Sequence, residues 1–390
     1  MTATTTVRTT TLEVRFTAPG GSPVLDDRAF SVSCSFGFDQ RYAEATVRRT
    51  GGGSLDISYW DAVEIRMGAT PGAGAAVRFA GYVVPVDNAL FPIEGVVTCK
   101  GRLYRAEWVR NQTAGGTNLP GATGATDQAM VQQVLNYCQV PFTAANVSGT
   151  GETLGAGYVN WDDPLTPGPF TWGEGESGLA LIQRLDEVSV PDDYSGRYRT
   201  FESLGGDVYR IKLATTPTAT PDFSFTEGVD VLEAKITRDP TGAANRVVVT
   251  GAPLSLPNIP TVVGAQTYTA SSPTAPYLPP GLPNGPEGYP SVAMPFASPL
   301  LEKSTIAAAG TGLSCEQVAR FLLGEYNCVV DTLEFSTPRD DLLGPGQTIH
   351  LDSPRLAITD PAQHYWLQRL EITLDERGAL TQRLTCIRKS

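Results

Sequence analysis

Residues 229–251, VDVLEAKITRDPTGAANRVVVTG, are the stretch of this sequence that decides the fold. The pattern predicts two β-strands joined by a reversal at DPTG (residues 239–242), because proline pre-sets φ for a turn and glycine accepts a positive φ. The apolar alternation slips near Leu232, and an extra residue in one strand, a β-bulge, would produce such a slip. A two-stranded ribbon cannot bury its apolar face alone, so we expect it to belong to a larger sheet.

The composition favours several domains built from short strands. The 390 residues suggest roughly two to four domains at about 150 residues each. A hydrophobic content of 41% is enough for packed cores, and 40 glycines with 30 prolines favour frequent turns over long helices. The net charge of −12 argues against a nucleic-acid-binding protein, which needs an excess of Lys and Arg. An acidic surface past which DNA moves without adhering is compatible with this charge.

Cysteine usage and the start of the chain indicate a protein made in a reducing cytoplasm. The cysteines are scattered without a C-x-x-C pair, and a chain of this length does not need disulfides, so we expect reduced, mostly buried thiols. They are Cys34, Cys99, Cys138, Cys315, Cys328 and Cys386. No apolar run approaches the ~20 residues of a membrane helix. The first residues, MTATTTVRTTTLEVRF, lack the basic start and apolar core of a signal peptide.

The first half of the chain changes character once. Residues 10–112 carry short strands, the clearest with apolar residues at every second position from Phe30 to Phe38, which predicts a β-barrel or sandwich. Residues 113–227 contain two helices, N-capped by Thr126 and Ser177, and a strand pair. This mixture predicts an α+β insert domain.

A second set of barrel-length strands is expected in residues 228–251 and 316–390, which are separated by residues 252–315. A helix should begin at the capping box Ser314–Gln317. Residues 252–300 are so dense in proline that regular sheet and helix are excluded there, which predicts an extended or polyproline-like arm. The arm would lie along a neighbouring subunit or domain, or would be a plain surface loop. The predicted fold class is therefore mainly β with an α+β insert and a proline-rich arm.

The sequence offers no residue set that points to catalysis, a cofactor or a metal ion. His350 and His364 lie in strand-like contexts and are expected to be structural, since two isolated histidines cannot supply a usual zinc site. Ser177, in the sequence GESG, misses the nucleophile elbow of hydrolases because the second glycine is misplaced. Neither a phosphate-binding loop nor a dinucleotide-binding loop is present. We therefore predict no catalytic, cofactor-binding or metal-binding residue.

Paired acidic residues are the remaining candidates for a ligand site. Asp162-Asp163, Asp192-Asp193 and Asp340-Asp341 could hold calcium, but none has the alternating spacing of a calcium loop, so solvated loop charges are expected. Trp161 and Trp172 beside acidic residues would also suit a glycan-cleaving cleft. A glycan-binding or glycan-cleaving β-rich protein acting on the host surface is therefore the alternative function. A secreted adhesion module is a third hypothesis, against which the unpaired cysteines and the missing signal peptide count.

Several phrases, in a fixed order along the chain, resemble those of the baseplate hub proteins of phage tails and related injection machines. They are WDAVEIRMG, VRFAGYVV, VVTCKGRLYRAEW, DQAMVQQVLNYC, GESGLALIQRLDEVS, the stretch at 229–251, GLSCEQVARFLL and LLGPGQTIHL. The resemblance spans residues 10–388 and is one of architecture and short phrases. It does not extend to residues 252–300, so it leaves the partner of the arm open.

The resemblance implies a homotrimer in which each chain contributes two tube-like β-barrel domains, residues 1–112 and residues 228–251 with 316–390. Three chains would form a pseudo-six-fold ring that joins a hexameric tail tube to a trimeric spike or fibre. The implied partners are the tail tube or distal tail protein ring, the spike or fibre protein, and the tape measure protein. DNA would pass the lumen without specific binding during genome ejection, repelled by an acidic lining. The chain would be a structural virion protein of the tail tip, assembled in the host cytoplasm, and not an enzyme.

Overall fold

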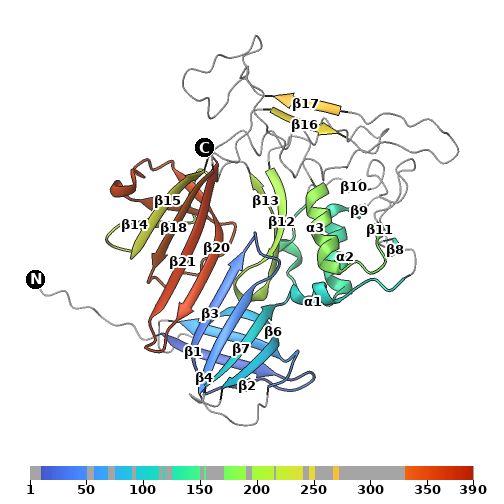
Figure 1. Cartoon of the computed structure of the whole chain (residues 1–390), viewed down its shortest axis with the longest axis vertical. Helices are drawn as coiled ribbons and strands as arrows, with labels where there is room; N and C mark the ends of the chain where they lie inside the picture. Colours follow the sequence, from blue (N-terminus) through green and yellow to red (C-terminus); the bar gives the residue numbers. More distant parts are fainter. Residues whose placement is uncertain are drawn as a thin grey trace, which may run out of the picture.

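The computed structural model, drawn in Figure 1, describes residues 10–50, 57–68, 75–89, 94–113, 117–118, 125–149, 153–154, 171–189, 196–214, 217–239, 246–250, 267–271 and 330–389. Strands dominate, and 13 of them form one sheet in which a single path runs β15-β18-β21-β20-β3-β4-β7-β6-β5-β1-β2. The α+β part contributes three α-helices to the described residues and lies beside this sheet. The predicted mainly β fold with an α+β part is confirmed.

The N-terminal lobe contains seven strands: β1 (Thr11–Thr17), β2 (Val24–Leu25), β3 (Ala29–Gly37), β4 (Glu44–Thr50), β5 (Ala62–Gly68), β6 (Ala76–Ala89) and β7 (Glu94–Gly101). Apolar residues at period two put one side of each strand into the core, as in β3, where Val32, Cys34 and Phe36 are buried between serines. The long β6 pairs first with β5 and then with β7. A register shift between Val83 and Val86 accompanies this exchange of partners.

The C-terminal lobe contains β14 (Phe223–Thr226), β15 (Glu233–Asp239), β18 (Val330–Thr337), β19 (Thr348–Asp352), β20 (His364–Leu374) and β21 (Leu380–Lys389). β20 pairs with β21, with β19 and also with β3 of the other lobe, and β14 joins in parallel with β19. The β3–β20 pairing, from Arg369 opposite Gly37 to Leu374 opposite Val32, makes the two lobes one sheet. Their buried apolar residues likewise form one continuous cluster.

The α+β part is built on α1 (Tyr104–Trp108), α2 (Asp127–Tyr137), α3 (Gly178–Val188) and the hairpin of β12 (Gly196–Glu202) and β13 (Val208–Ala214). Two short strand pairs complete it: β8 (Thr117–Asn118) with β11 (Thr171–Trp172), and β9 (Ala125–Thr126) with β10 (Thr153–Leu154). The predicted N-caps are confirmed, because Thr126 accepts the N–H of Ala129 and Ser177 accepts the N–H of Ala180. A second apolar cluster lies between the helices and the hairpin.

The segment 229–251 forms two strands as predicted, but they do not pair with each other. β15 pairs with β18, and β16 (Arg246–Thr250) pairs with β17 (Thr267–Ser271). The predicted hairpin is therefore wrong, because β18, some ninety residues further on, offers β15 a partner along its whole length. β17 is also a correction, since it places a strand inside 252–300, in a short run free of proline.

The slip near Leu232 has a structural cause at the start of β15. Leu232 donates its N–H to the carbonyl of Ser336 at 2.9 Å, while Glu233 is the register partner of the same Ser336. Two residues therefore lie opposite one, which is the arrangement of the predicted bulge.

Other predictions fall outside the described residues. They are residues 240–242 of the turn predicted at 239–242, the helix from Ser314, residues 272–300 of the arm, Trp161, and the acidic pairs at 162–163 and 192–193. The domain limits 1–112, 113–227, 228–251 with 316–390, and 252–315 stay a prediction.

Candidate assembly interface

One face of the continuous sheet is accessible and rich in hydroxyl groups. Along β15, β18, β21, β20, β3, β4 and β7, residues of the apolar core alternate with residues on the opposite face. The hydroxyl-bearing members of that face include Ser31, Ser33, Ser35, Thr46, Thr98, Thr237, Thr332, Thr373, Thr381 and Thr385. Val96 and Ile387 are apolar members of the same face. We call this surface the hydroxyl face.

Charges on the hydroxyl face occur in pairs of opposite sign. Lys100 bonds to Glu44 on the neighbouring strand, and Arg369 bonds to Asp39 at 2.6 Å. In the register of the sheet, Arg383 lies opposite Glu371 and Lys235 lies opposite Glu334. The pairing leaves this surface close to neutral, although the chain carries a net charge of −12. The acidic excess therefore lies elsewhere on the molecule.

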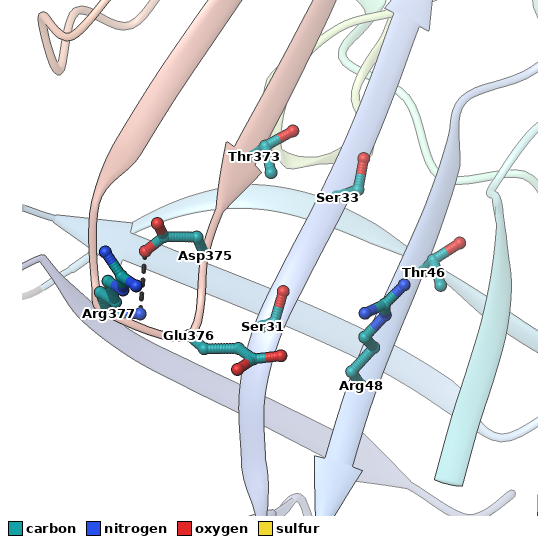
Figure 2. Close-up of a pocket in the computed structure, with 8 residues that line it drawn as sticks. All are labelled: Ser31, Ser33, Thr46, Arg48, Thr373, Asp375, Glu376 and Arg377. Carbon is teal, nitrogen blue, oxygen red and sulfur yellow. Dashed lines mark hydrogen bonds between the residues drawn. The ribbon is translucent and has the colours of Figure 1, made fainter. Parts of the chain in front are cut away.

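A shallow polar concavity of about 530 Å³ lies on the hydroxyl face where the two lobes join. Figure 2 shows its lining, which comes from β3, β4, the end of β20 and the β20–β21 turn: Ser31, Ser33, Thr46, Arg48, Thr373, Asp375, Glu376 and Arg377. The Asp375 carboxylate accepts the backbone N–H of Arg377 at 2.9 Å and so fixes the turn. The lining consists of hydroxyl-bearing side chains and charged side chains of both signs.

The sheet has unpaired edges on both sides of the hydroxyl face. Among the described strands, β15 pairs only with β18, and Val86 to Ala89 of β6 pair only with β7. β15 is preceded by exposed apolar residues, including Val229 and Leu232, which are 78% and 63% exposed. A strand edge with free N–H and C=O groups is a template for pairing with another chain. The two edges could thus meet in successive copies of the protein.

The α+β part is fixed to the N-terminal lobe through a buried carboxylate. Glu202, at the end of β12, accepts the backbone N–H groups of Ala43 and Leu103, each at 2.7 Å. Burial raises the pKa of Glu202 to about 7, although both N–H donors and the nearby Arg102 lower it. The carboxylate occupies the space that a side chain at Gly101 would need, so glycine is required there. Glu202 is therefore an ionisable link between two parts of the chain.

A second link joins the two lobes. Arg78 of β6 is buried and binds the Asp340 carboxylate, and it donates to the Asp341 carbonyl at 2.9 Å. Asp341 in turn pairs with Arg339 at 2.7 Å. The expectation of solvated loop charge at Asp340-Asp341 is therefore wrong, because both carboxylates take part in partly buried ion pairs. The loop is held against β6 by these bonds.

Within the α+β part, one arginine ties both long helices to the hairpin. Arg210 of β13 is fully buried and pairs with Asp127 of α2 at 2.9 Å and Asp186 of α3 at 2.8 Å. Its guanidinium also lies over the Tyr198 ring, 4.6 Å from the centroid. Removal of any one member of this network is expected to destabilise the fold, because a remaining charge would be buried without its partner. Sequence reasoning missed it, since the three residues are far apart in the chain.

The other candidates from the sequence have structural roles. His350 and His364 face each other across β19 and β20, and each ring nitrogen Nδ1 lies within 3.1 Å of a backbone carbonyl. Trp172 is 3% exposed, and its indole N–H donates to the Glu176 carbonyl, so it cannot stack on a sugar. Cys34, Cys99, Cys138 and Cys386 are free and buried as predicted. Burial raises the pKa of Cys138 to about 12, and burial also raises the pKa of the other three thiols.

The described residues contain neither a metal-binding cluster nor a membrane-spanning helix. No group of three or more His, Cys, Asp or Glu side chains in that part of the chain could hold a metal ion. None of its helices combines the length and apolar character needed to cross a bilayer.

Solved structures share this fold. The 43 kDa tail protein of prophage MuSo2 from Shewanella oneidensis superposes with a TM-score of 0.58 at 11% identity, covering 96% of this chain and 98% of that chain. The tail protein from Neisseria meningitidis MC58 superposes with a TM-score of 0.56 at 11% identity, covering 97% and 96%. No protein-family model and no curated protein matches the sequence. The resemblance to phage tail proteins is thus confirmed as a resemblance of fold over nearly the whole chain.

Proposed function

We propose that this chain is a structural hub protein of a phage tail tip or baseplate. The observation that carries the proposal is the continuous sheet through both lobes, with one polar face and an unpaired edge on either side. Two lobes per chain give a trimer six similar ring positions, which suits a junction between a hexameric tail tube and a trimeric spike or fibre. The fold shared with tail proteins supports this assignment.

In the proposed ring, the β15 edge of one copy pairs with the β6 edge of the next. Strands alternate in direction from β15 to β6, so such a pairing would be antiparallel like its neighbours. Closure removes both edges from solvent, which a monomer cannot do. The tail tube or distal tail protein ring, the spike or fibre protein and the tape measure protein remain the proposed partners at the two ends.

The hydroxyl face would line the DNA conduit in this arrangement. A lining with balanced charges offers phosphates no net attraction, and its hydroxyls hold water, so the genome can slide without specific binding. In this proposal, balanced charges and hydration, and not repulsion by an acidic lining, allow DNA to pass through the conduit. No catalytic step is part of the proposal.

Cysteine pairs across the two edges test the ring directly. Thr237→Cys in β15 combined in turn with a cysteine at Asp87, Asn88 or Ala89 in β6 should give disulfide-linked trimers under mild oxidation. Thr237→Cys combined with Asp360→Cys, on an exposed loop, serves as the matched control and should give none. A protein that is monomeric by mass photometry and by cryo-EM within assembled tails would refute the hub assignment.

A further inference from the structure

Six aromatic side chains form a cluster where the N-terminal lobe meets α1 (Figure 1). Each ring centroid of this aromatic cluster lies within 6.2 Å of at least one other: Tyr42, Tyr59, Trp60, Tyr82, Tyr104 and Trp108. The cluster reaches solvent, since Tyr59 is 46% and Trp108 is 56% exposed. Neither edge of the proposed ring, β15 or residues 86–89, contributes to it.

Trp60 is the centre of the aromatic cluster, and two exposed rings stand against it as walls. Its ring stacks on Tyr104 with centroids 5.6 Å apart and planes inclined by 25°. Tyr59 and Trp108 are nearly perpendicular to Trp60, at 76° and 83°. Perpendicular rings form a corner, which suits a compact group better than a flat one.

The corner is fixed by the backbone before any ligand binds. Trp60 has a φ of 72°, in the left-handed region that bulky residues rarely adopt. Its N–H donates to the Val83 carbonyl at 3.0 Å, and Val83 donates in return to the Asp61 carbonyl at 2.9 Å. The Asp61 carboxylate also accepts the N–H of Ser58 at 2.7 Å. A ligand would therefore lose little free energy in ordering this turn.

The electrostatics of the aromatic cluster favour a cation. Aromatic faces carry partial negative charge and attract ammonium groups within about 6 Å. One ring of the cluster already binds in this way, because Lys100 Nζ lies 5.1 Å from the Tyr42 centroid. Asp61, beside Trp60, is 2% exposed, and its Oδ1 has no hydrogen-bond partner among the described residues.

The formal charges around the cluster do not oppose this preference. Arg41 and Glu107 form an ion pair at 3.8 Å and cancel each other. Arg105 bonds to the neutral side chain of Gln139, and its charge is offset by Asp61. The ring faces and the net charge of −12 on the whole chain then favour a positive ligand over an acidic one.

We propose that the aromatic cluster binds a lysine side chain of a partner protein. The ammonium group lies in the corner that Trp60 forms with Tyr59 and Trp108, and the aliphatic part of the side chain covers the exposed rings. This site is separate from the hub function, because it requires neither the edges of the sheet nor the hydroxyl face.

Fluorine NMR of the full-length protein labelled with 5-fluorotryptophan tests the proposal, with each ¹⁹F signal assigned by replacing one tryptophan with phenylalanine. The probe is the peptide acetyl-GGKGG-amide, and its matched control carries Nε-acetyllysine, which is neutral. The charged peptide should shift the Trp60 and Trp108 signals saturably and leave those of Trp172 and Trp366 unchanged. Its affinity should exceed that of the acetylated peptide by about tenfold.

Two variants locate the binding site. Trp108→Leu keeps an apolar side chain but removes the ring, and the shift of the Trp60 signal should then require about tenfold more peptide. Tyr137→Leu, at a 64% exposed ring outside the cluster, should leave the affinity unchanged.

Three results would overturn the proposal. Equal affinity for the charged and the acetylated peptide would show that the ammonium group is not recognised. No saturable shift up to about 10 mM peptide would exclude a site with a Kd of about 1 mM. A shift of the Trp60 and Trp108 signals with chitotriose, without one for the charged peptide, would assign the cluster to a sugar.

Discussion

The buried carboxylate of Glu202 should make the junction between the α+β part and the N-terminal lobe sensitive to pH. Its side chain is 1% exposed, so solvent screening does not weaken the effect of burial. The pKa rises from 4.5 to about 7 on folding, so the folded state binds the proton more readily than the unfolded state. Stability from this group is fully present below pH 4.5 and is lost as pH rises to about 7. The difference corresponds to roughly 3 kcal/mol.

The matched comparison is Glu202→Gln, which keeps the shape of the side chain and removes its titration. The Gln amide group would face one of the two backbone N–H donors, which adds a cost that does not depend on pH. The free energy of opening can be measured from hydrogen exchange of the Ala43 and Leu103 amides between pH 4.5 and pH 8. This local measurement avoids assuming that the whole chain unfolds in one step.

We expect the free energy of opening of the native protein, minus that of Glu202→Gln, to fall by roughly 3 kcal/mol between pH 4.5 and pH 8. A difference that stays constant would show that Glu202 does not titrate between these limits. A difference that grows with pH would show that the two N–H donors and Arg102 outweigh burial and hold the carboxylate ionised. Either outcome refutes the argument from burial.

Three further predictions follow from contacts described above. Arg210→Met leaves Asp127 and Asp186 buried without their cation and should destabilise the protein by about 3–5 kcal/mol, measured by urea unfolding. An unchanged urea concentration at the midpoint of unfolding would contradict this prediction, since it would mean that the two carboxylates take up protons at no cost in stability. Arg78→Met should release the loop at Asp340-Asp341 and speed its proteolysis, whereas Arg355→Met, at an 88% exposed side chain, should not. Because burial raises the pKa of Cys34, Cys99, Cys138 and Cys386, none of these thiols should react with Ellman's reagent before unfolding; rapid reaction in the native protein would contradict their burial.

Local patterns were readable from the sequence because they depend on neighbours in the chain. The alternation of Val32, Cys34 and Phe36 predicts β3 with the correct buried side. Thr126 and Ser177 were predictable as helix caps because a cap acts three residues away. The slip at Leu232 could be read as a bulge for the same reason.

Pairing between distant segments was not readable in this way. β15 and β16 look like a hairpin in sequence, and only the availability of β18 and β17 as partners decides otherwise. Glu202 ends an ordinary strand pattern, and its burial depends on Ala43 and Leu103, which come from another part of the chain. The aromatic rings that contact one another around Trp60 come from residues between Tyr42 and Trp108, which share no common spacing.

The distribution of charge changes what the net charge of the chain can explain. A total of −12 suggests that the molecule repels DNA wherever the two meet. On the hydroxyl face, however, Lys100 bonds to Glu44, and Arg383 and Lys235 lie opposite Glu371 and Glu334. Screening at physiological salt weakens charges more than about 8 Å away, so DNA in a conduit would respond chiefly to the lining. If that lining is the hydroxyl face, passage depends on balanced charges and hydration. The acidic excess would then serve solubility or contacts with other tail proteins on the remaining surface.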